Sequence, residues 1–396
     1  YFAVEDLSEK LMAKFIFVHN GDEKFNELIK KGHERVLKAR LTDAKFFFEE
    51  DLKVPFVKYV EKLKKVVHQE KLGTLFDKTI RLRDFVKVIA EKLSLENEVI
   101  KNVERAAYLC KADLVTNMVV EFPELQGIMA REYARLSSES EEIANAIFEH
   151  YLPRTSEDVL PSSIEGKVLS LADKIDEIVG CFSIGLIPTG SEDPYALRKQ
   201  ATGIINILLQ NQFHLFLDEL IEFLLSKMKV ERDLLPNVKA ITEEFFLGRL
   251  RAQLLGEGYS FDSIDSVLSL KLFDVLEVKN RVEVLDKLRG SEILNDIVTA
   301  FTRCKNLANL SAGAKVNCSF LMEEEEKKLF SRLIEAENKV AECLGAYDYK
   351  EALGILSGLR PIIDRFFDKV LVMTEEENIR DNRLALLNKS VSLFIK

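Results

Sequence analysis

The sequence has no tryptophan and little of the residues that interrupt helices: 17 glycines and 8 prolines among 396 residues. No apolar run approaches the roughly 18 residues that a membrane-spanning helix needs, so no membrane association is expected. The five cysteines are dispersed and odd in number, without a CxxC pair. This argues against a disulfide framework or a structural zinc and fits a reducing cytoplasm.

The first residues, Tyr1 to Glu5, contain neither an initiator methionine nor a signal-peptide pattern. We therefore expect a fragment of a longer cytoplasmic protein. With 47% hydrophobic and 31% charged residues, including 26 phenylalanines, the composition is that of a globular protein with sizeable cores. The net charge of −10 counts mildly against nucleic-acid binding, although a local basic stripe can operate on an acidic chain.

Apolar residues recur with helical spacing along most of the chain, which predicts a mainly α-helical fold. One such stripe includes Leu82, Phe85 and Ile89. The one convincing strand is residues 15–18, followed by the turn signal Asn20-Gly21. Since a single strand must pair, we expect its partner outside this chain, and the strand as the remnant of a truncated sheet.

Breaks in the helical pattern divide the chain into four parts. Residues 1–65 are expected to be the end of a mixed N-terminal domain with a helical connector. Residues 66–215 form a compact helical domain, residues 216–275 a second helical connector, and residues 276–396 a final helical bundle. No internal repeat or low-complexity linker is evident.

Residues 105–113 are similar to the helix on which metal-dependent phosphohydrolases of the HD type carry a His-Asp pair. Here that pair is Cys110-Lys111, and the first histidine of such a site, expected near residues 77–81, is absent. Asp173 matches the later aspartate. A lysine ammonium repels a divalent cation where ligands are required. We therefore expect a degenerate site without metal, in which Asp113 and Asp173 cap or pair with buried polar groups.

The loop over residues 187–198 allows two interpretations. Asp193 and Pro194 are favourable N-cap and N1 residues, so a helix should begin there. Arg198, one turn in, could back an anion site at the helix N-terminus, but a well-capped helix whose arginine pairs with a nearby carboxylate is the stronger interpretation. The run from Asp113 to Gly127 has no role that the sequence assigns.

Two further segments gather basic residues beside apolar ones. Arg35 and Arg40 lie near three consecutive phenylalanines, which suits either a phosphate backbone or a solvated helix face. Near the C-terminus, Arg303, Arg380 and Arg383 lie on helices with apolar backs. No phosphate loop, GxGxxG, HExxH or nucleophile elbow occurs, so the residues alone indicate no chemical mechanism.

Several long motifs occur in one order along nearly the whole chain: residues 34–48, 72–78, 111–119, 121–127, 188–198 and 362–373, with Asn382-Arg-Leu384. In these motifs the chain closely resembles the beta subunits of bacterial heterotetrameric glycyl-tRNA synthetases. The resemblance would leave the N-terminal part of such a subunit outside this chain.

The resemblance implies a tRNA-binding subunit whose partners are the alpha subunit and tRNA(Gly). The alpha subunit activates glycine with ATP and Mg²⁺, so this chain is expected to bind no cofactor and to carry no catalytic residue. Its middle domain would be a degenerate HD fold, and its last bundle is similar to the anticodon-binding domain of arginyl-tRNA synthetase. The candidate tRNA contacts are Arg35, Arg40, Arg198, Arg303, Asn306, Arg380 and Arg383. The alternatives are an HD-type phosphohydrolase and a purely structural scaffold.

Overall fold

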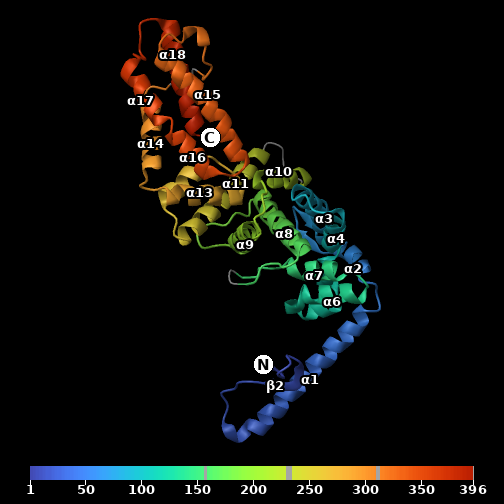
Figure 1. Ribbon diagram of the computed structural model, residues 1–396. Coiled ribbons are helices and arrows are strands. Elements are labelled where there is room, and N and C mark those ends of the chain that lie inside the picture. Colours follow the sequence, from blue (N-terminus) through green and yellow to red (C-terminus); the bar gives the residue numbers. More distant parts are fainter. Residues whose placement is uncertain (156–157, 229–233, 309–312, 396) are drawn as a thin grey trace.

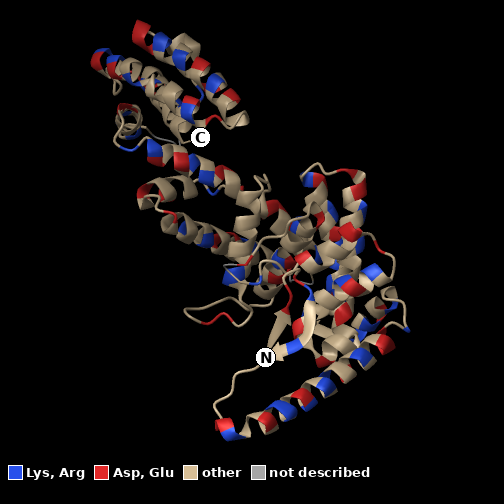
Figure 2. Ribbon diagram, turned by 60° about the horizontal axis from the view of Figure 1, so that its bottom comes forward, with Lys and Arg blue, Asp and Glu red and all other residues tan. Residues whose placement is uncertain are grey.

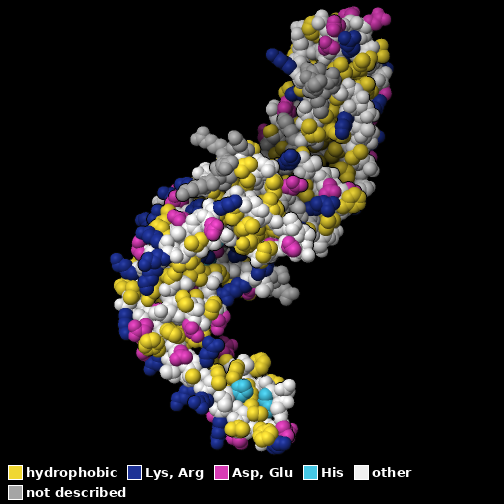
Figure 3. Space-filling view, turned by 180° about the vertical axis from the view of Figure 1, so that it is seen from behind, with side chains coloured by type: hydrophobic (Ala, Val, Ile, Leu, Met, Phe, Trp, Pro, Cys, Tyr) yellow, Lys and Arg dark blue, Asp and Glu magenta, His cyan; other side chains and the backbone are white. Residues whose placement is uncertain are grey.

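The computed structural model describes residues 1–155, 158–228, 234–308 and 313–395. It is mainly helical, as the sequence predicts. Figure 1 shows an elongated molecule made of an N-terminal arm (residues 1–51), a central body (52–290) and a C-terminal bundle (291–395). Seen from behind, its outline is arched and hollowed between the arm and the body (Figure 3). Among the described residues, none of the helices is both long and apolar enough to cross a membrane.

The arm is a two-stranded hairpin followed by one long helix. Strand β1 (Phe2–Glu5) pairs antiparallel with β2 (Leu11–Ile16), so that Ala3 lies opposite Phe15. The strand expected at residues 15–18 is therefore shifted, and the prediction that its partner lies outside the chain is wrong. The turn that closes the hairpin is held by Asp6, whose carboxylate accepts the backbone N–H groups of Ser8 and Lys10.

Helix α1 (Asn26–Asp51) connects the hairpin to the body, after the short 3₁₀ helix η1 (Glu23–Phe25). It extends away from the other helices over most of its length (Figure 1), and Lys, Arg, Asp and Glu alternate along it (Figure 2). Such a polar helix is typical of a solvated spacer between two folded parts.

The buried carboxylate of Asp51 fixes the end of α1 in the body. Its oxygens accept the backbone N–H groups of Asn117 and Met118 at 2.9 Å and the hydroxyls of Tyr59 and Tyr133 at 3.3 and 2.8 Å. A buried carboxylate needs such donors to offset the loss of its hydration. The end of the arm is thus attached through this carboxylate and through apolar side chains such as Phe47 and Phe48, which pack against the core of the body.

The helices of the body share one apolar core. The first part comprises α2 (Val57–Lys62), η2 (Leu63–Lys65), β3 (Val67–Gln69), β4 (Gly73–Thr74), α3 (Leu75–Lys92), α4 (Asn97–Leu109), η3 (Ala112–Val115), α5 (Asn117–Glu121), η4 (Pro123–Leu125), α6 (Ile128–Leu136), α7 (Glu141–Glu149), α8 (Ile164–Ser183) and α9 (Leu197–Gln210). The second part comprises α10 (Leu217–Lys227), α11 (Leu235–Gly256), α12 (Phe261–Leu268) and α13 (Val275–Lys287).

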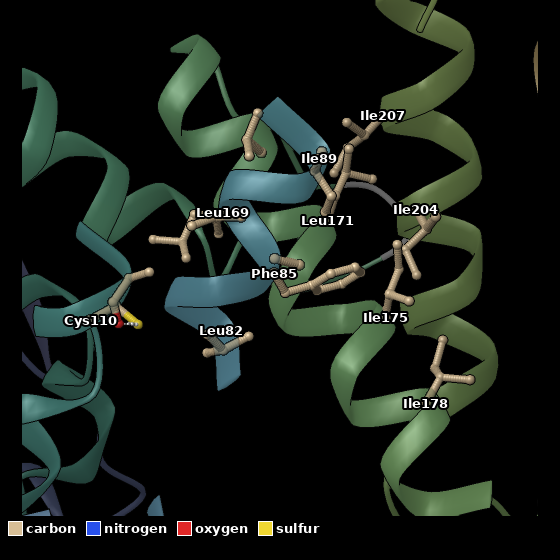
Figure 4. Close-up of a cluster of buried hydrophobic side chains, with 14 of the residues drawn as sticks. Leu82, Phe85, Ile89, Cys110, Leu169, Leu171, Ile175, Ile178, Ile204 and Ile207 are labelled. Carbon is tan, nitrogen blue, oxygen red and sulfur yellow. Dashed lines mark hydrogen bonds between the residues drawn. The ribbon is translucent and has the colours of Figure 1, made fainter. Parts of the chain in front are cut away.

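Helix α8 is the centre of the body. It packs on α3, α4, α7 and α9, and its length is apolar on most sides, as expected for a helix surrounded by others. The close-up in Figure 4 shows Leu82, Phe85 and Ile89 of α3 and Ile204 and Ile207 of α9 near the leucines and isoleucines of α8. These side chains are fully buried. Their packing fixes the positions of the helices and therefore of the polar side chains that the same helices carry.

The bundle has a second core of its own, built from residues 300 to 393. Its elements are α14 (Glu292–Lys305), η6 (Cys318–Phe320), α15 (Glu324–Gly345), α16 (Tyr349–Ser357), α17 (Arg360–Lys369) and α18 (Glu377–Phe394). Phe366 and Leu386 are among its fully buried residues. At the junction with the body, the imidazole of His214 stacks on Tyr347 with ring centroids 4.3 Å apart.

Candidate functional site

A cluster of charged side chains lies inside the body where α3, α4 and α8 meet. Helix α3 contributes Lys78, and α8 contributes Asp173, Asp176 and Glu177. Lys111 directly follows Cys110, the C-cap of α4. These helices pack on one another, so residues nearly 100 positions apart converge. Lys111 and Asp173 are the residues that the sequence placed at the degenerate metal site.

Lys78 is the most enclosed cation of this cluster. Its Nζ lies 3.2 Å from Asp173 Oδ1, 3.0 Å from Asp176 Oδ2 and 2.8 Å from Glu177 Oε2, and only 3% of its surface is exposed. Arg81 donates from Nη2 to Asp176 Oδ2 at 3.0 Å. Lys78 lies in the segment where an HD-type site would carry its first histidine.

Lys111 completes the cluster on the other side of Asp173, with its Nζ 2.8 Å from Asp173 Oδ2. Burial by itself would raise the pKa of Asp173, but the ammonium groups of Lys111 and Lys78 outweigh it and hold that pKa well below its usual value. Asp173 is thus ionised and neutralised by lysine on both oxygens. The prediction that it pairs with buried polar groups is confirmed.

His150, the C-cap residue of α7, also belongs to this cluster. The sequence did not predict this position for His150. Its Nε2 is 2.9 Å from Lys111 Nζ, and its Nδ1 faces the carbonyl oxygen of Ile147. A neutral ring that donates from Nδ1 and accepts at Nε2 satisfies both contacts. Burial and the charge of Lys111 accordingly hold the pKa of His150 well below its usual value.

These residues do not fit a divalent metal. No group of three or more His, Cys, Asp or Glu side chains that could hold a metal ion occurs among the described residues. Both carboxylate oxygens of Asp173 already face ammonium groups, where a cation would meet repulsion. The thiol of Cys110 is fully buried and donates to the Ala107 carbonyl, and burial raises its pKa to about 12, so it offers no thiolate ligand.

Asp113 serves the local fold. Its Oδ2 accepts the backbone N–H of Gly127 at 2.7 Å, and burial raises the pKa of this carboxyl to about 6. Gly127 has φ of +81°, and a Cβ there would lie 2.6 Å from the ring of Tyr151. The hydrogen bond between Asp113 and Gly127 therefore joins the two ends of this segment. Only glycine fits at its second end, because of the positive φ and the close approach of Tyr151.

An open cavity of about 560 Å³ lies in front of the charged cluster. Its polar lining includes Lys78, Lys111, Asp173 and Glu177 of the cluster. Further lining residues come from the segment after α7 and from the start of α9: Tyr151, Arg154, Tyr195, Lys199 and Gln200. The charged cluster is thus open to solvent on one side, where the cavity is lined by residues that the sequence motifs did not predict.

Lys174 also lines this cavity but has a different environment from the other lysines. Its Nζ donates to the carbonyl oxygens of His150 and Leu152 at 3.1 and 2.7 Å and to Ser170 Oγ at 2.8 Å. Burial, only partly offset by the charge of Asp173, lowers the pKa of Lys174 to about 7. Among the described residues its hydrogen-bond partners are two carbonyl groups and a hydroxyl, and no carboxylate pairs with it.

The predicted helix start after residue 193 is wrong by three residues. Helix α9 begins at Leu197, and the N-cap residue Ala196 has a left-handed backbone. The capping role of Asp193 is real, because its carboxylate accepts the backbone N–H groups of Leu197 and Arg198 at 2.8 and 2.9 Å. Within the described part of the chain, no ion pair of the Arg198 side chain is found, and its tRNA contact stays a prediction.

The other predicted contact residues fall into two places. Arg35 and Arg40 are exposed on α1, and the Arg40 guanidinium lies 5.4 Å from the centre of the Phe122 ring. In the bundle, Arg303 and Asn306 lie at the end of α14, and Arg380 and Arg383 lie on α18, which packs against α14. The structure therefore brings the C-terminal four onto adjacent helices, far from the two on the arm (Figure 1).

These four bundle residues differ in how free they are. The Arg383 guanidinium is nearly buried, paired with the fully buried Glu326 and donating to the Leu371 carbonyl at 2.9 Å. Arg303 pairs with Asp364 and lies over the Phe367 ring. Asn306 is exposed, and Arg380 has only loose ion pairs of 3.7 and 3.8 Å. Asn306 and Arg380 are thus the more available side chains.

Comparisons with known proteins cover both halves of the chain. A family model described as "Glycyl-tRNA synthetase beta subunit" matches residues 1–269, and one described as "DALR anticodon binding domain" matches residues 297–394. Proteins named "Glycine--tRNA ligase beta subunit" are similar throughout. The protein of Desulforamulus reducens is 44% identical over 99% of the chain, that of Geobacter sp. strain M21 43% over 100%, and that of Clostridioides difficile 43% over 96%. The chain spans 57%, 57% and 55% of these three relatives.

Proposed function

Because the chain belongs to the family of glycyl-tRNA synthetase beta subunits, we propose that it is the tRNA-binding, non-activating part of a glycine–tRNA ligase. The family match confirms the resemblance on which this function was predicted. In the proposed ligase, an alpha subunit activates glycine with ATP and Mg²⁺, and the two kinds of subunit form a cytoplasmic heterotetramer. This chain contributes RNA binding and no cofactor.

The observation that carries this proposal is the match of residues 297–394 to an anticodon-binding domain. Those residues have an apolar core of their own, so the bundle can present a fixed surface to RNA. Lys305 and Asn306 are exposed at the end of α14, and α14 packs against α18, the helix that carries Arg380. A few cations on one face suffice to bind phosphates when the whole chain is acidic.

We further propose that the body is an HD-like helical domain whose polar centre has become structural. The convergence of Lys78, Lys111 and Asp173 supports this view, because ammonium groups stand beside the aspartate that would hold a metal. A metal-dependent phosphohydrolase would need ligands that the described residues do not bring together. No observation favours that alternative.

The test uses the complete ligase, with alpha subunits and full-length beta subunits, and measures tRNA(Gly) binding and charging. The double variant Asn306→Ala/Arg380→Ala should weaken tRNA binding about tenfold or more, and the affinity of the wild type should fall steeply with added salt. Lys328→Ala, which removes an exposed cation from α15, is the matched control and should bind nearly as the wild type does.

Two results would count against the proposal. Equal loss in the control and in the double variant would show a general effect of charge. Unchanged tRNA affinity in the double variant, together with normal assembly with alpha, would favour a scaffold without RNA contacts on the bundle.

A further inference from the structure

The cavity in front of the charged cluster has an excess of positive charge at its wall. Lys78 and Lys111 are neutralised by Asp173 and Glu177, so these four lining residues balance. The remaining charged lining residues are Arg154, Lys174, Lys199 and Glu124. Three basic side chains thus face one carboxylate, which lies exposed at the rim, and Lys174, with its pKa of about 7, is charged only in part near neutral pH.

None of these three basic side chains is paired with a carboxylate among the described residues. The Arg154 guanidinium contacts the Gln126 carbonyl and lies 5.4 Å from the centre of the Phe148 ring. Lys174 donates to two carbonyls and a hydroxyl. Lys199 is exposed on the first turns of α9. Unpaired cations that converge on a concave wall raise the local concentration of anions.

Tyr151 adds an uncharged donor to the same wall. Its hydroxyl is buried and has no partner at hydrogen-bond geometry among the described residues, although the Gln126 side chain lies close to it. Its ring lies 4.6 Å from Lys111 Nζ, measured to the ring centre. A buried hydroxyl without a partner forfeits a hydrogen bond that a ligand oxygen could restore. The wall therefore offers donors to an anion with several oxygens.

We propose that this cavity binds a phosphate-bearing ligand of nucleotide size. A phosphate monoester carries close to two negative charges and three acceptor oxygens, which suits the excess of cations and the free hydroxyl better than a single carboxylate does. The volume of about 560 Å³ lies within the range of small-molecule sites. The ligand site is separate from the bundle and does not depend on the proposed contact with tRNA.

The probes are inorganic phosphate and 8-azido-AMP, used on the complete alpha–beta ligase. After irradiation, we expect the photoprobe on beta-subunit peptides that line the cavity, within residues 150–200, and excess inorganic phosphate should reduce the labelling. Arg154→Met and Lys199→Met should each reduce this labelling about tenfold, since each removes a charge-assisted contact. Both side chains are exposed, so neither variant should perturb folding.

Lys101→Met is the matched control, because Lys101 is exposed on α4 and does not line the cavity. Its labelling should equal that of the wild type. Labelling confined to the alpha subunit, or labelling of residues 150–200 that Arg154→Met and Lys199→Met leave unchanged, would overturn the proposal. Protection of the peptides by tRNA(Gly) but not by phosphate would overturn it too, since the cavity would then serve RNA. None of these results would alter the bundle's proposed role, which is read from tRNA affinity.

Discussion

At the scale of single residues, the presence of a lysine next to Cys110 has a direct structural consequence. The ammonium of Lys111 lies 2.8 Å from Asp173 Oδ2 inside the body. Burial removes the hydration of both charges and so offsets much of their attraction. Such an ion pair is stable only where its geometry is good and further hydrogen bonds satisfy the remaining polar atoms. The body therefore retains a charged centre that stabilises the packing of α3, α4 and α8.

Removing one member of this pair should be costly. Lys111→Ala leaves Asp173 buried with Lys78 as its one remaining ammonium partner, so we expect the free energy of unfolding to fall by about 3 kcal/mol. Urea denaturation followed by circular dichroism measures this loss. The double variant Lys111→Met/Asp173→Leu should lose clearly less unfolding free energy than the single variants Lys111→Met and Asp173→Leu lose in sum. Strict additivity would mean that the pair is not coupled.

Lys174 predicts a dependence of stability on pH. Its pKa is about 7 in the folded chain, against an ordinary value of 10.5. Because the folded pKa is the lower one, the stability linked to this lysine is complete above about pH 10.5 and is lost as the pH falls toward 7. The unfolding free energy of the wild type, relative to Lys174→Met, should rise by up to about 1.4 kcal/mol per pH unit over this window. A difference that stays constant with pH, measured in urea titrations, would contradict the assignment.

The residues of the site were only partly predictable. The spacing of Cys110, Lys111 and Asp173 is similar to that of an HD-type site, so the sequence alone indicates these residues. His150 and Glu177 reach the cluster only because α7 and α8 fold against α3 and α4, and no local pattern marks such convergence. The pairing of Arg383 with Glu326 was missed for the same reason, since 57 residues separate the two.

At the scale of elements, helical periodicity predicted the class of the fold, while the ends of elements depended on side chains that act at a distance. Asp193 marks the start of α9 but reaches across three residues to do so. The hairpin escaped prediction because Asp6, not the Asn20-Gly21 pair, closes it. Turn chemistry of this kind is weak in sequence and becomes evident only with the backbone path.

The junction between α1 and the body rests on Asp51. Asp51→Ala removes the acceptor of two backbone N–H groups and two tyrosine hydroxyls, so we expect a loss of about 3 kcal/mol in unfolding free energy. Hydrogen exchange at the amides of Asn117 and Met118 should accelerate in proportion.

Asp43→Ala provides the control for this experiment. It removes an exposed carboxylate from the same helix and should change neither stability nor exchange by a measurable amount. If Asp51→Ala behaved like this control, the carboxylate would not be what attaches the arm.

At the scale of the whole molecule, two apolar cores lie at different positions along an elongated chain, and the arm extends from the opposite side (Figure 1). Positive charge is distributed over all three parts (Figure 2), which explains why composition alone could not locate an RNA-binding face. We propose that the bundle makes the central contact with tRNA.

The most direct test of this assignment is a crosslinking map of tRNA(Gly) on the complete alpha–beta ligase. We predict anticodon-region crosslinks to bundle peptides around Asn306 and Arg380, lost at high salt and reduced in the double variant that replaces both residues. Crosslinks of the anticodon region to the arm or the body alone, with none on residues 291–395, would contradict it.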